Sequence, residues 1–336
     1  MRYKNNNPRT VFPDALPNIG HACGHNLIAM ASLSAGLATA SLMRRHSLPG
    51  KILIFGTPGE EGYRGGKTLL LARGAYTGVD ISLISHPGTQ NNNPMMRTAA
   101  FCRLAATYTG VPAHAAKAPW RGVNALDALV LAYNAVSALR QQTMPGDVIS
   151  LAITDGGGNA ASVVHAHAAG VCVLRARSAA RLEVLQRKVA ACFRAGAEAT
   201  GARVEVEVTR GYRDHVPNRM LAGCYARCWR GLREEAPDPP VPRCGEAAWV
   251  MAGTDQGDVS YALPSVNASF AIVPGPLGGE PHSPDFERAA GTRGAFGRAL
   301  RVGKALAGTA VEVLTTKGLL DDVKREWRRS MEGIDG

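Results

Sequence analysis

Two short apolar runs in the first third of the chain constrain its fold most. Lys51–Phe55 (KILIF) is followed by the breakers GTPG, and Val79–Ser85 (VDISLIS) is followed by HPG. A helical pattern precedes each run, over Asn26–His46 and over Thr68–Arg73. Apolar strands that alternate with helices are typical of a parallel sheet covered on both faces. The sequence therefore predicts an α/β fold with a mostly parallel sheet flanked by helices.

A different order of elements begins near Ala99. Strands and helices follow one another there as βαββαβ, which is the ferredoxin-like arrangement. The expected elements are Cys102–Thr109, Asn124–Gln141, Val148–Thr154, Val163–Arg175, Ala180–Thr200 and Val204–Val208. After Gly211 the α/β pattern resumes with a helix near Arg219–Arg233, the strand Ser269–Val273 and C-terminal helices. We therefore expect an α+β domain at 99–211, inserted between the two parts of a larger domain at 1–98 and 212–336.

Composition excludes several classes of protein. No run of 18 apolar residues occurs, so no transmembrane helix is expected, and the N-terminus MRYKNNNPRTVFPD lacks the apolar centre of a secretory signal. Seven scattered cysteines, an odd number, do not indicate a disulfide framework. We therefore expect a cytoplasmic protein. The net charge of +11 comes mostly from dispersed arginines, so no nucleic-acid partner is expected.

Histidine, cysteine and glutamate gather where the predicted strands end. HACGH (21–25) precedes a helix, Glu60 and Glu61 follow the first strand, and His86 ends the second. His282, in GGEPHSPDF, follows a later strand. Ligands of open α/β sheets bind at the carboxyl ends of the strands. Thiolate, imidazole and carboxylate together suit zinc or another transition metal.

The adjacent glutamates allow a division of labour. One can ligate a metal, while the other accepts a proton from metal-activated water and passes it to a leaving amine. That chemistry hydrolyses amides. Each residue alone also has a plainer interpretation, because single histidines are more often structural and paired loop glutamates are usually solvated. Their shared position at strand ends is what favours a metal site.

Six ordered motifs strengthen this interpretation. They are DALPNIGHACGHN, GTPGEEGYRGGK, SHPG, GVPAHAAKAPWRGVNALDA, ITDGG and GTDQGDVSY, the last followed by PHSPDF. Together they resemble the amidohydrolase branch of the zinc aminoacylase and carboxypeptidase metallopeptidases, which includes aminobenzoyl-glutamate and hippurate hydrolases and auxin-conjugate hydrolases. HACGHN with DALP is most similar to the β-alanyl-lysine dipeptidase-like proteins of this branch. The resemblance runs from about Asp14 to the C-terminus. It implies a zinc-peptidase-like catalytic domain with an inserted lid, and a homodimer formed through that lid.

The resemblance also implies a set of site residues. Two divalent metal ions are expected, zinc or manganese, with cobalt as a further possibility. The implied ligands are Cys23, which would bridge the two ions, His25, Glu61, His86 and His282. Glu60 would be the general base.

Five further residues have implied roles outside the ligand set. His114 would steady the oxyanion, supplied by a partner subunit. Arg175 matches a lid arginine and Asp255 matches the acidic position in GTDQGD, so both are predicted to bind substrate. His21 and Asp14 would lie around the ligands and orient them.

Two departures from the family pattern affect this prediction. Relatives carry a longer segment before DALP, and a chain without it would expose sheet edges and apolar helix faces. After DGG this chain has SVVHAHA where relatives have a sequence like NVVPD. The second departure concerns recognition of the substrate carboxylate more than metal binding.

The leading hypothesis is therefore a metal-dependent amidohydrolase that acts on a small N-acyl amino acid or a dipeptide. One alternative is a truncated, inactive paralogue that works by binding or oligomerising. Another is a cysteine hydrolase using Cys23 and His25, although residues so close in sequence rarely pair in this way and the glutamates would have no role. No membrane partner is expected.

Overall fold

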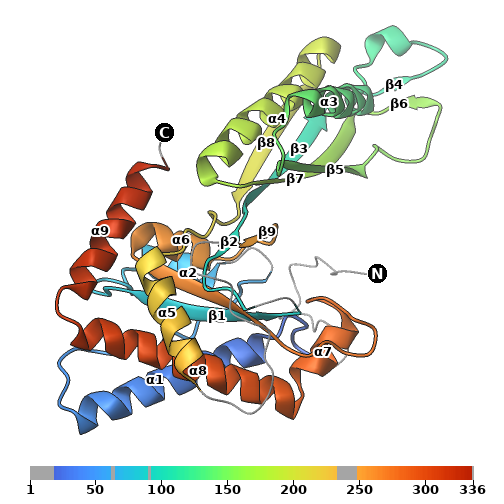
Figure 1. Cartoon of the computed structure of the whole chain (residues 1–336). Coiled ribbons are helices and arrows are strands. Elements are labelled where there is room, and N and C mark those ends of the chain that lie inside the picture. The colour runs from blue at the N-terminus through green and yellow to red at the C-terminus, as the bar shows by residue number, and fades with distance from the viewer. Residues whose placement is uncertain (1–18, 62–64, 90–91, 233–247, 335–336) are drawn as a thin grey trace.

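The structure is a computed structural model that describes residues 19–61, 65–89, 92–232 and 248–334. Asp14 lies outside the described residues. The elements form two bodies, one above the other in Figure 1, and the chain crosses between them near β2 and β9. The lower body contains both ends of the described chain, so the upper body is an insertion.

Parallel strand pairs form the centre of the lower body. β1 (Ser82–Gly88) pairs with β10 (Ser265–Ala271), and the short β2 (Met96–Thr98) pairs with β9 (Ala248–Val250), both in parallel. Helices surround these strands (Figure 1). They are α1 (His25–Arg45), α2 (Gly66–Ala72), α5 (Arg219–Gly231), α6 (Gln256–Ala262), α7 (Pro284–Ala290), α8 (Arg293–Thr315) and α9 (Leu319–Glu332). The predicted α/β class is confirmed.

Close contact between α1 and α8 builds much of the lower core. The buried residues of α1 recur every four positions, at Leu27, Ala31, Ala35 and Thr39, and so form one stripe. A Cβ atom on Gly303 of α8 would lie 2.0 Å from the hydroxyl of Ser34, so glycine is required for this approach. By length and apolar composition α1 could cross a membrane, but core helices pass the same test.

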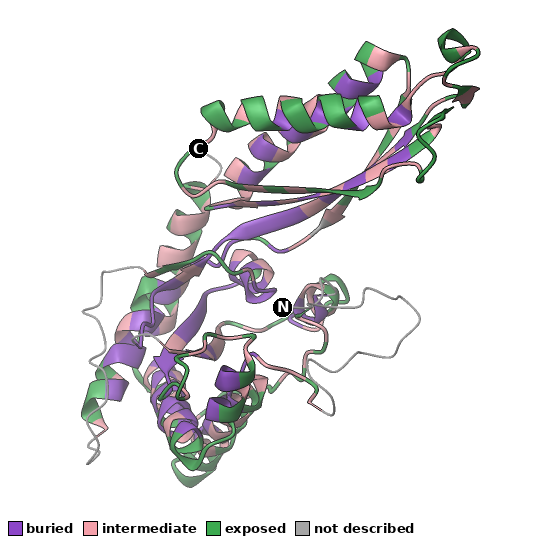
Figure 2. Cartoon of the chain, turned by 90° about the vertical axis from the view of Figure 1, so that its right-hand side faces the viewer, coloured by how far each residue is buried: buried purple, intermediate pink, exposed green. Residues whose placement is uncertain are grey.

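The upper body has the predicted ferredoxin-like order. Its antiparallel sheet has the order β5-β7-β3-β8, and two helices cover one face (Figure 2). The strands are β3 (Ala100–Thr109), β5 (Val148–Asp155), β7 (His167–Ala176) and β8 (Arg203–Arg210), and the helices are α3 (Ala125–Leu139) and α4 (Ala179–Thr200). The short strands β4 (Ala113–His114) and β6 (Val163–Val164) pair at the end far from the lower body (Figure 1). Single 3-10 turns cover Pro119–Arg121 and Arg140–Gln142.

The prediction of a buried strand at Lys51–Phe55 is wrong. No described strand pairs with this segment, and Leu53 and Ile54 are 46% and 51% exposed. A strand forms only where a neighbour satisfies its backbone groups, and apolar composition alone supplies no such neighbour. The apolar side chains contact helices instead, since Ile54 lies against Gly36 of α1. β1 also begins three residues later than predicted, where its register with β10 starts.

The two crossings between the bodies pack tightly against each other. The backbone N–H of Phe101 donates to the carbonyl of Tyr212 at 3.0 Å, and the two rings meet edge to face with centroids 5.2 Å apart. Cβ atoms on Gly211 and Gly253 would lie 2.6 and 2.4 Å from ring atoms of Phe101. The relative position of the two bodies therefore depends on Phe101 and Tyr212.

Candidate active site

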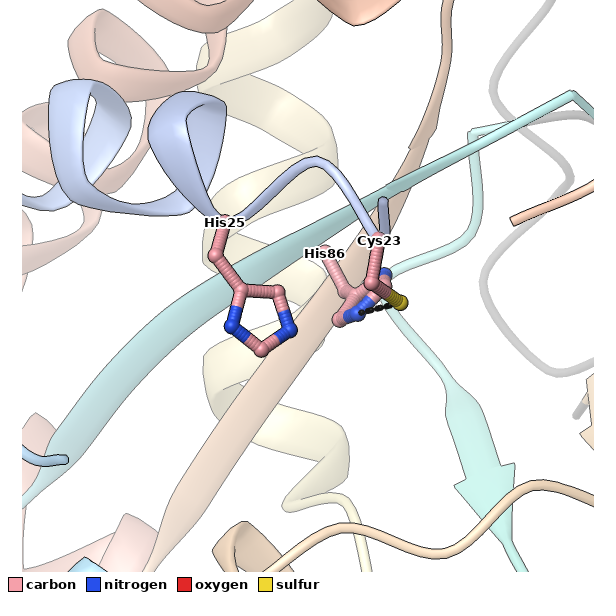
Figure 3. A group of neighbouring side chains, drawn as sticks. All are labelled: Cys23, His25 and His86. Carbon is pink, nitrogen blue, oxygen red and sulfur yellow. Dashed lines mark hydrogen bonds between the residues drawn. The ribbon is translucent and has the colours of Figure 1, made fainter. Parts of the chain in front are cut away.

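The turn before α1 directs Cys23 and His25 toward the end of β1. Gly24 has a φ of +74°, a left-handed conformation that glycine adopts without strain. A Cβ atom at this position would also lie 2.5 Å from Cγ of Pro87. Glycine is therefore required by both conformation and space. Figure 3 shows the result, with the side chains of Cys23, His25 and His86 on the same side of the turn.

His86 is held in the tautomer that suits a metal ligand. Its Nδ1 donates to the carbonyl of Pro87 at 2.7 Å, because a carbonyl oxygen can only accept. The lone pair is therefore on Nε2, which lies 3.6 Å from Sγ of Cys23 (Figure 3). Burial lowers the pKa of His86 and so favours the neutral ring. Metal-bound histidines commonly have their second nitrogen held in this way.

A second loop brings His282 to Glu61. Nε2 of His282 lies 2.6 Å from Oε1 of Glu61. The backbone of His282 has a φ of +74°, which is uncommon for a residue with a side chain and typical of functional sites. Its N–H donates to the carbonyl of Ala22 at 2.7 Å, which ties this loop to the HACGH turn.

The described donors form three overlapping groups, each with its ligand atoms within 4.8 Å of one another. The groups are Cys23–His25–His86, Cys23–Glu61–His282 and His25–Glu60–Glu61. Cys23 belongs to two of them, as a bridging ligand must. Nε2 of His25 is buried without a hydrogen-bond partner and lies 3.8 Å from a carboxylate oxygen of each glutamate. A buried, unpartnered nitrogen among thiol, imidazole and carboxylate groups fits a divalent metal ion.

The electrostatics differ between the two glutamates. Burial, together with the charges of Glu61 and Asp255, raises the pKa of Glu60 to about 7. Burial also raises the pKa of Glu61, but the hydrogen bond and charge of His282 outweigh it and lower the pKa to about 2. Burial and neighbouring His86 lower the pKa of His25 to about 4. Near pH 7, Glu61 is thus charged and His25 neutral, as ligands need to be, while Glu60 can gain or lose a proton.

Comparison with known proteins assigns this chain to a family. A family model described as a peptidase dimerisation domain matches residues 98–201. The mouse Xaa-Arg dipeptidase is 36% identical over 322 residues, which cover 95% of this chain and 72% of that protein. The chain belongs to the M20 peptidase family.

Two further relatives agree with this assignment. One subunit of the Escherichia coli p-aminobenzoyl-glutamate hydrolase is 31% identical over 202 residues, which cover 60% of this chain and 42% of that protein. A dinuclear metal binding peptidase from the M20 family, from Bacillus subtilis, has the same fold, with a TM-score of 0.60, 18% identity and coverage of 89% of this chain and 77% of that chain. The predicted amidohydrolase branch is confirmed. This M20 protein is a hydrolase of peptide or amide bonds.

Lys67 was missed in the sequence and lies beside the site. Its ammonium group is 2.6 Å from Oδ1 of Asp255, and its backbone N–H donates to Oδ2 of the same carboxylate. Both side chains are buried, so Asp255 is an internal partner of Lys67, and its contact with substrate stays a prediction. No local signal in the sequence reveals this contact, because Lys67 and Asp255 are 188 positions apart.

Tyr212 is a second residue that the sequence did not reveal. Its hydroxyl donates to the carbonyl of Glu60 at 2.7 Å and accepts from the N–H of Gly65 at 3.0 Å. It therefore holds Glu60 and Gly65, the two ends of the segment that we call the glutamate loop. Because Tyr212 also lies in a crossing between the two bodies, the position of Glu60 is linked to the inserted body.

The remaining predicted residues lie in three different places. His21 stacks on His25 with ring centroids 5.7 Å apart, which is compatible with an orienting role. Arg175 donates to the carbonyl of Met251 at 2.8 Å and lies over the ring of Phe101. His114 is exposed on β4, at the far end of the upper body in Figure 1, and is not among the residues around Cys23.

Proposed function

We propose that this M20 hydrolase cleaves the amide bond of a dipeptide or a small N-acyl amino acid with the help of two divalent metal ions. The observation that carries the proposal is the sharing of Cys23 between two groups of metal-ligating atoms. The proposed ligands are Cys23, His25, Glu61, His86 and His282. Thiolate and imidazole favour zinc, while manganese and cobalt are the other candidates.

The mouse relative, named for its action on Xaa-Arg dipeptides, supports a dipeptide as substrate. The E. coli relative, named for p-aminobenzoyl-glutamate, supports an N-acyl amino acid. Both molecules contain an amide next to a free carboxylate. We propose Arg175, on the inserted body, as the partner of that carboxylate, since it is the predicted residue with a guanidinium group near the crossing.

Glu60 is the proposed general base. When bound, the metal would supply a Lewis acid that polarises the amide carbonyl and makes water more acidic. Glu60, with a pKa of about 7, accepts a proton from the attacking water and hands it to the leaving amine. Its loop is held by Tyr212, so the carboxylate does not have to be ordered at the moment of reaction.

The site argues against Cys23 as an activated nucleophile. Burial and the two nearby glutamates raise the pKa of its thiol. An activated cysteine instead needs a positive environment that lowers the pKa. A bound cation would reverse this effect, which supports a ligand role.

The proposed assembly is a homodimer formed through the inserted body. The body is proposed as a lid and dimerisation domain at 99–211, between the catalytic segments 1–98 and 212–336. β5 is an edge strand, and Val148 and Ile153 on it are 38% and 44% exposed. An exposed apolar edge of this kind pairs readily with a second copy. In the dimer, His114 would come from the partner subunit. We also propose the cytoplasm as the location.

The test combines metal analysis with a hydrolysis assay. Protein purified with zinc or manganese supplied should contain close to two ions per chain and should hydrolyse Xaa-Arg dipeptides or aminobenzoyl-glutamate. Chelation should abolish activity, and the added metal should restore it. A metal content near zero under these conditions would show that the proposed site does not bind metal, and the inactive paralogue would then be favoured.

A further inference from the structure

A cavity lies between the two bodies, away from the candidate active site. It has a volume of about 820 Å³ and is lined by the start of α4, the end of α9 and residues of β2 and β9. No residue of the Cys23 cluster lines it. In Figure 1, α9 lies on the left, whereas α7, which directly follows His282, lies on the right. The cavity is therefore separate from the site described above.

Arginine dominates the charge of this cavity. The five arginines in its lining are Arg97, Arg177, Arg181, Arg219 and Arg329. Arg181 is neutralised by an ion pair with Asp147. Among the described residues, none of the other four forms an ion pair with a carboxylate. The cavity thus concentrates positive charge, beyond the general excess of +11 over the whole chain.

Two of these guanidinium groups are held in place by one tryptophan. The central carbon of Arg97 lies 5.5 Å from the ring centroid of Trp249, and that of Arg177 lies 5.3 Å from it. A Cβ atom on Gly146 would lie 2.8 Å from Nε of Arg177, so the Arg177 side chain packs against Gly146 in space that a larger residue at position 146 would fill. Cation–π contact and packing reduce the rotamer freedom of both arginines before any ligand binds.

The two acids in the lining offset only part of this charge, since Asp214 interacts with Arg97 and Glu326 with Arg219. Asp214 is buried and accepts from the N–H of Ala179 at 2.8 Å and from the hydroxyl of Tyr261 at 2.7 Å. Glu326 accepts from the N–H of Arg219 and the hydroxyl of Ser330. Oδ1 of Asp214 and both carboxylate oxygens of Glu326 thus accept hydrogen bonds from these donors. Burial raises the pKa of both carboxyl groups, and the nearby charges of Arg97 on Asp214 and of Arg219 on Glu326 oppose this shift.

We propose that this cavity is a binding site for a small multivalent anion, a molecule with at least two phosphate or carboxylate groups. Guanidinium groups bind such oxygens in bidentate fashion, and the four available arginines come from different elements. Arg177 belongs to the upper body, while Arg97, Arg219 and Arg329 belong to the lower one. A bound anion would therefore connect the two bodies. The proposal does not depend on the proposed hydrolase function.

Calorimetric titration of the metal-loaded protein with pyrophosphate and, separately, with citrate tests the site. We expect saturable binding of one anion per chain for the chemistry that fits, and the two probes distinguish phosphate from carboxylate ligands. The double variant Arg97→Gln/Arg177→Gln should bind at least tenfold more weakly. Arg219→Gln/Arg329→Gln, at two exposed positions where folding is not at risk, should weaken binding as well.

Two controls test whether the anion binds in this cavity and nowhere else. Arg44→Gln/Arg45→Gln removes the same charge from an exposed part of α1 and should bind like wild type. Glu61→Gln alters the metal site, so unchanged affinity in this variant excludes binding of the probe to the metal. Equal loss of affinity in the Arg44/Arg45 variant, or wild-type affinity in both cavity variants, would overturn the proposal. So would the lack of saturable binding at millimolar concentrations of both probes.

Discussion

Glu60 and Glu61 are neighbours in the sequence, but their carboxyl groups lie in different surroundings. Glu61 faces His282, which lowers its pKa to about 2, while burial and then the acidic neighbours of Glu60 raise its pKa to about 7. The pKa values of two chemically identical side chains thus move in opposite directions because their contacts differ. This difference supports a ligand role for Glu61 and a proton-transfer role for Glu60.

Substitution of each glutamate by glutamine should therefore have distinct effects. Glu60→Gln keeps the shape but removes the proton acceptor, so turnover should fall by about 10²–10⁴ with metal content unchanged. Glu61→Gln should lower metal affinity instead, because an amide oxygen is a poorer ligand than a carboxylate. Elemental analysis and steady-state kinetics of both variants check this. Near-normal turnover in Glu60→Gln would rule out its role as base.

Cys23 should be protected from alkylation by metal. Coordination removes the free thiolate that reacts with iodoacetamide, so labelling of Cys23 should slow strongly when metal is bound. Peptide mass spectrometry with and without chelator measures the rate for each cysteine. Cys102 and Cys172, both buried in the upper sheet, are internal controls whose labelling should not depend on metal. Equal rates for Cys23 in both conditions would exclude ligation.

At the scale of elements, Tyr212 connects one of the two chain segments that join the bodies to the loop that begins at Glu60. Tyr212→Phe removes one hydroxyl that serves Glu60 and Gly65, while the ring and its contact with Phe101 remain. We expect kcat to fall about tenfold with metal content unchanged, and the pH profile of kcat to shift because Glu60 is less well placed. Tyr133→Phe, at an exposed position of α3, is the matched control. An unchanged pH profile in Tyr212→Phe would contradict the positioning role.

His215 joins elements of the lower body and should make stability depend on pH. Its ring is fully buried, donates to the carbonyl of Met96 and accepts from the hydroxyl of Ser265. Burial lowers its pKa from 6.5 to about 4, so the folded state resists protonation. The stabilisation is therefore complete above pH 6.5 and is lost as the pH falls toward 4, by about 3 kcal/mol.

Urea unfolding at several pH values measures this effect. The free energy of unfolding of His215→Gln should fall less between pH 6.5 and 4 than that of wild type. Its stability at pH 7 should be lower, because a buried network is disturbed. If the two proteins lose equal free energy over this range, another group causes the acid sensitivity.

Most helices and strands could be predicted from the sequence. The spacing of apolar residues and the glycine and proline residues that end an element are both properties of short segments. The βαββαβ order of the upper body and the helix at α1 are examples. Lys51–Phe55 shows the limit, since strand formation depends on a neighbour that its own composition does not reveal. The contact of Lys67 with Asp255 was also inaccessible, because these residues are 188 positions apart and meet only through packing. The five proposed ligands could be named only through the family resemblance, because Glu61 follows no described strand, Cys23 precedes a helix and His25 begins it.

At the scale of the whole molecule, a two-fold related copy should supply His114. His114 is exposed at the end of the upper body farthest from β1, so its own chain does not bring it to the site. Mixing inactive His114→Ala chains with inactive Glu60→Gln chains, followed by refolding, should restore part of the activity. One site of each mixed dimer then combines an intact Glu60 with an intact His114. Mixed dimers without activity, or a strictly monomeric protein, would refute the exchange.

The tie between the two loops of the site has a consequence for biosynthesis. Glu61 and His282 are separated by 221 positions, and the backbone of His282 closes against Ala22. A growing polypeptide exposes Cys23 and Glu61 long before the ribosome has added His282. Because proteins are made from the N-terminus onward, the full ligand set exists only late in translation. The proposed metal site would therefore be completed only after His282 has been synthesised, whereas Cys23 is present from the start of synthesis.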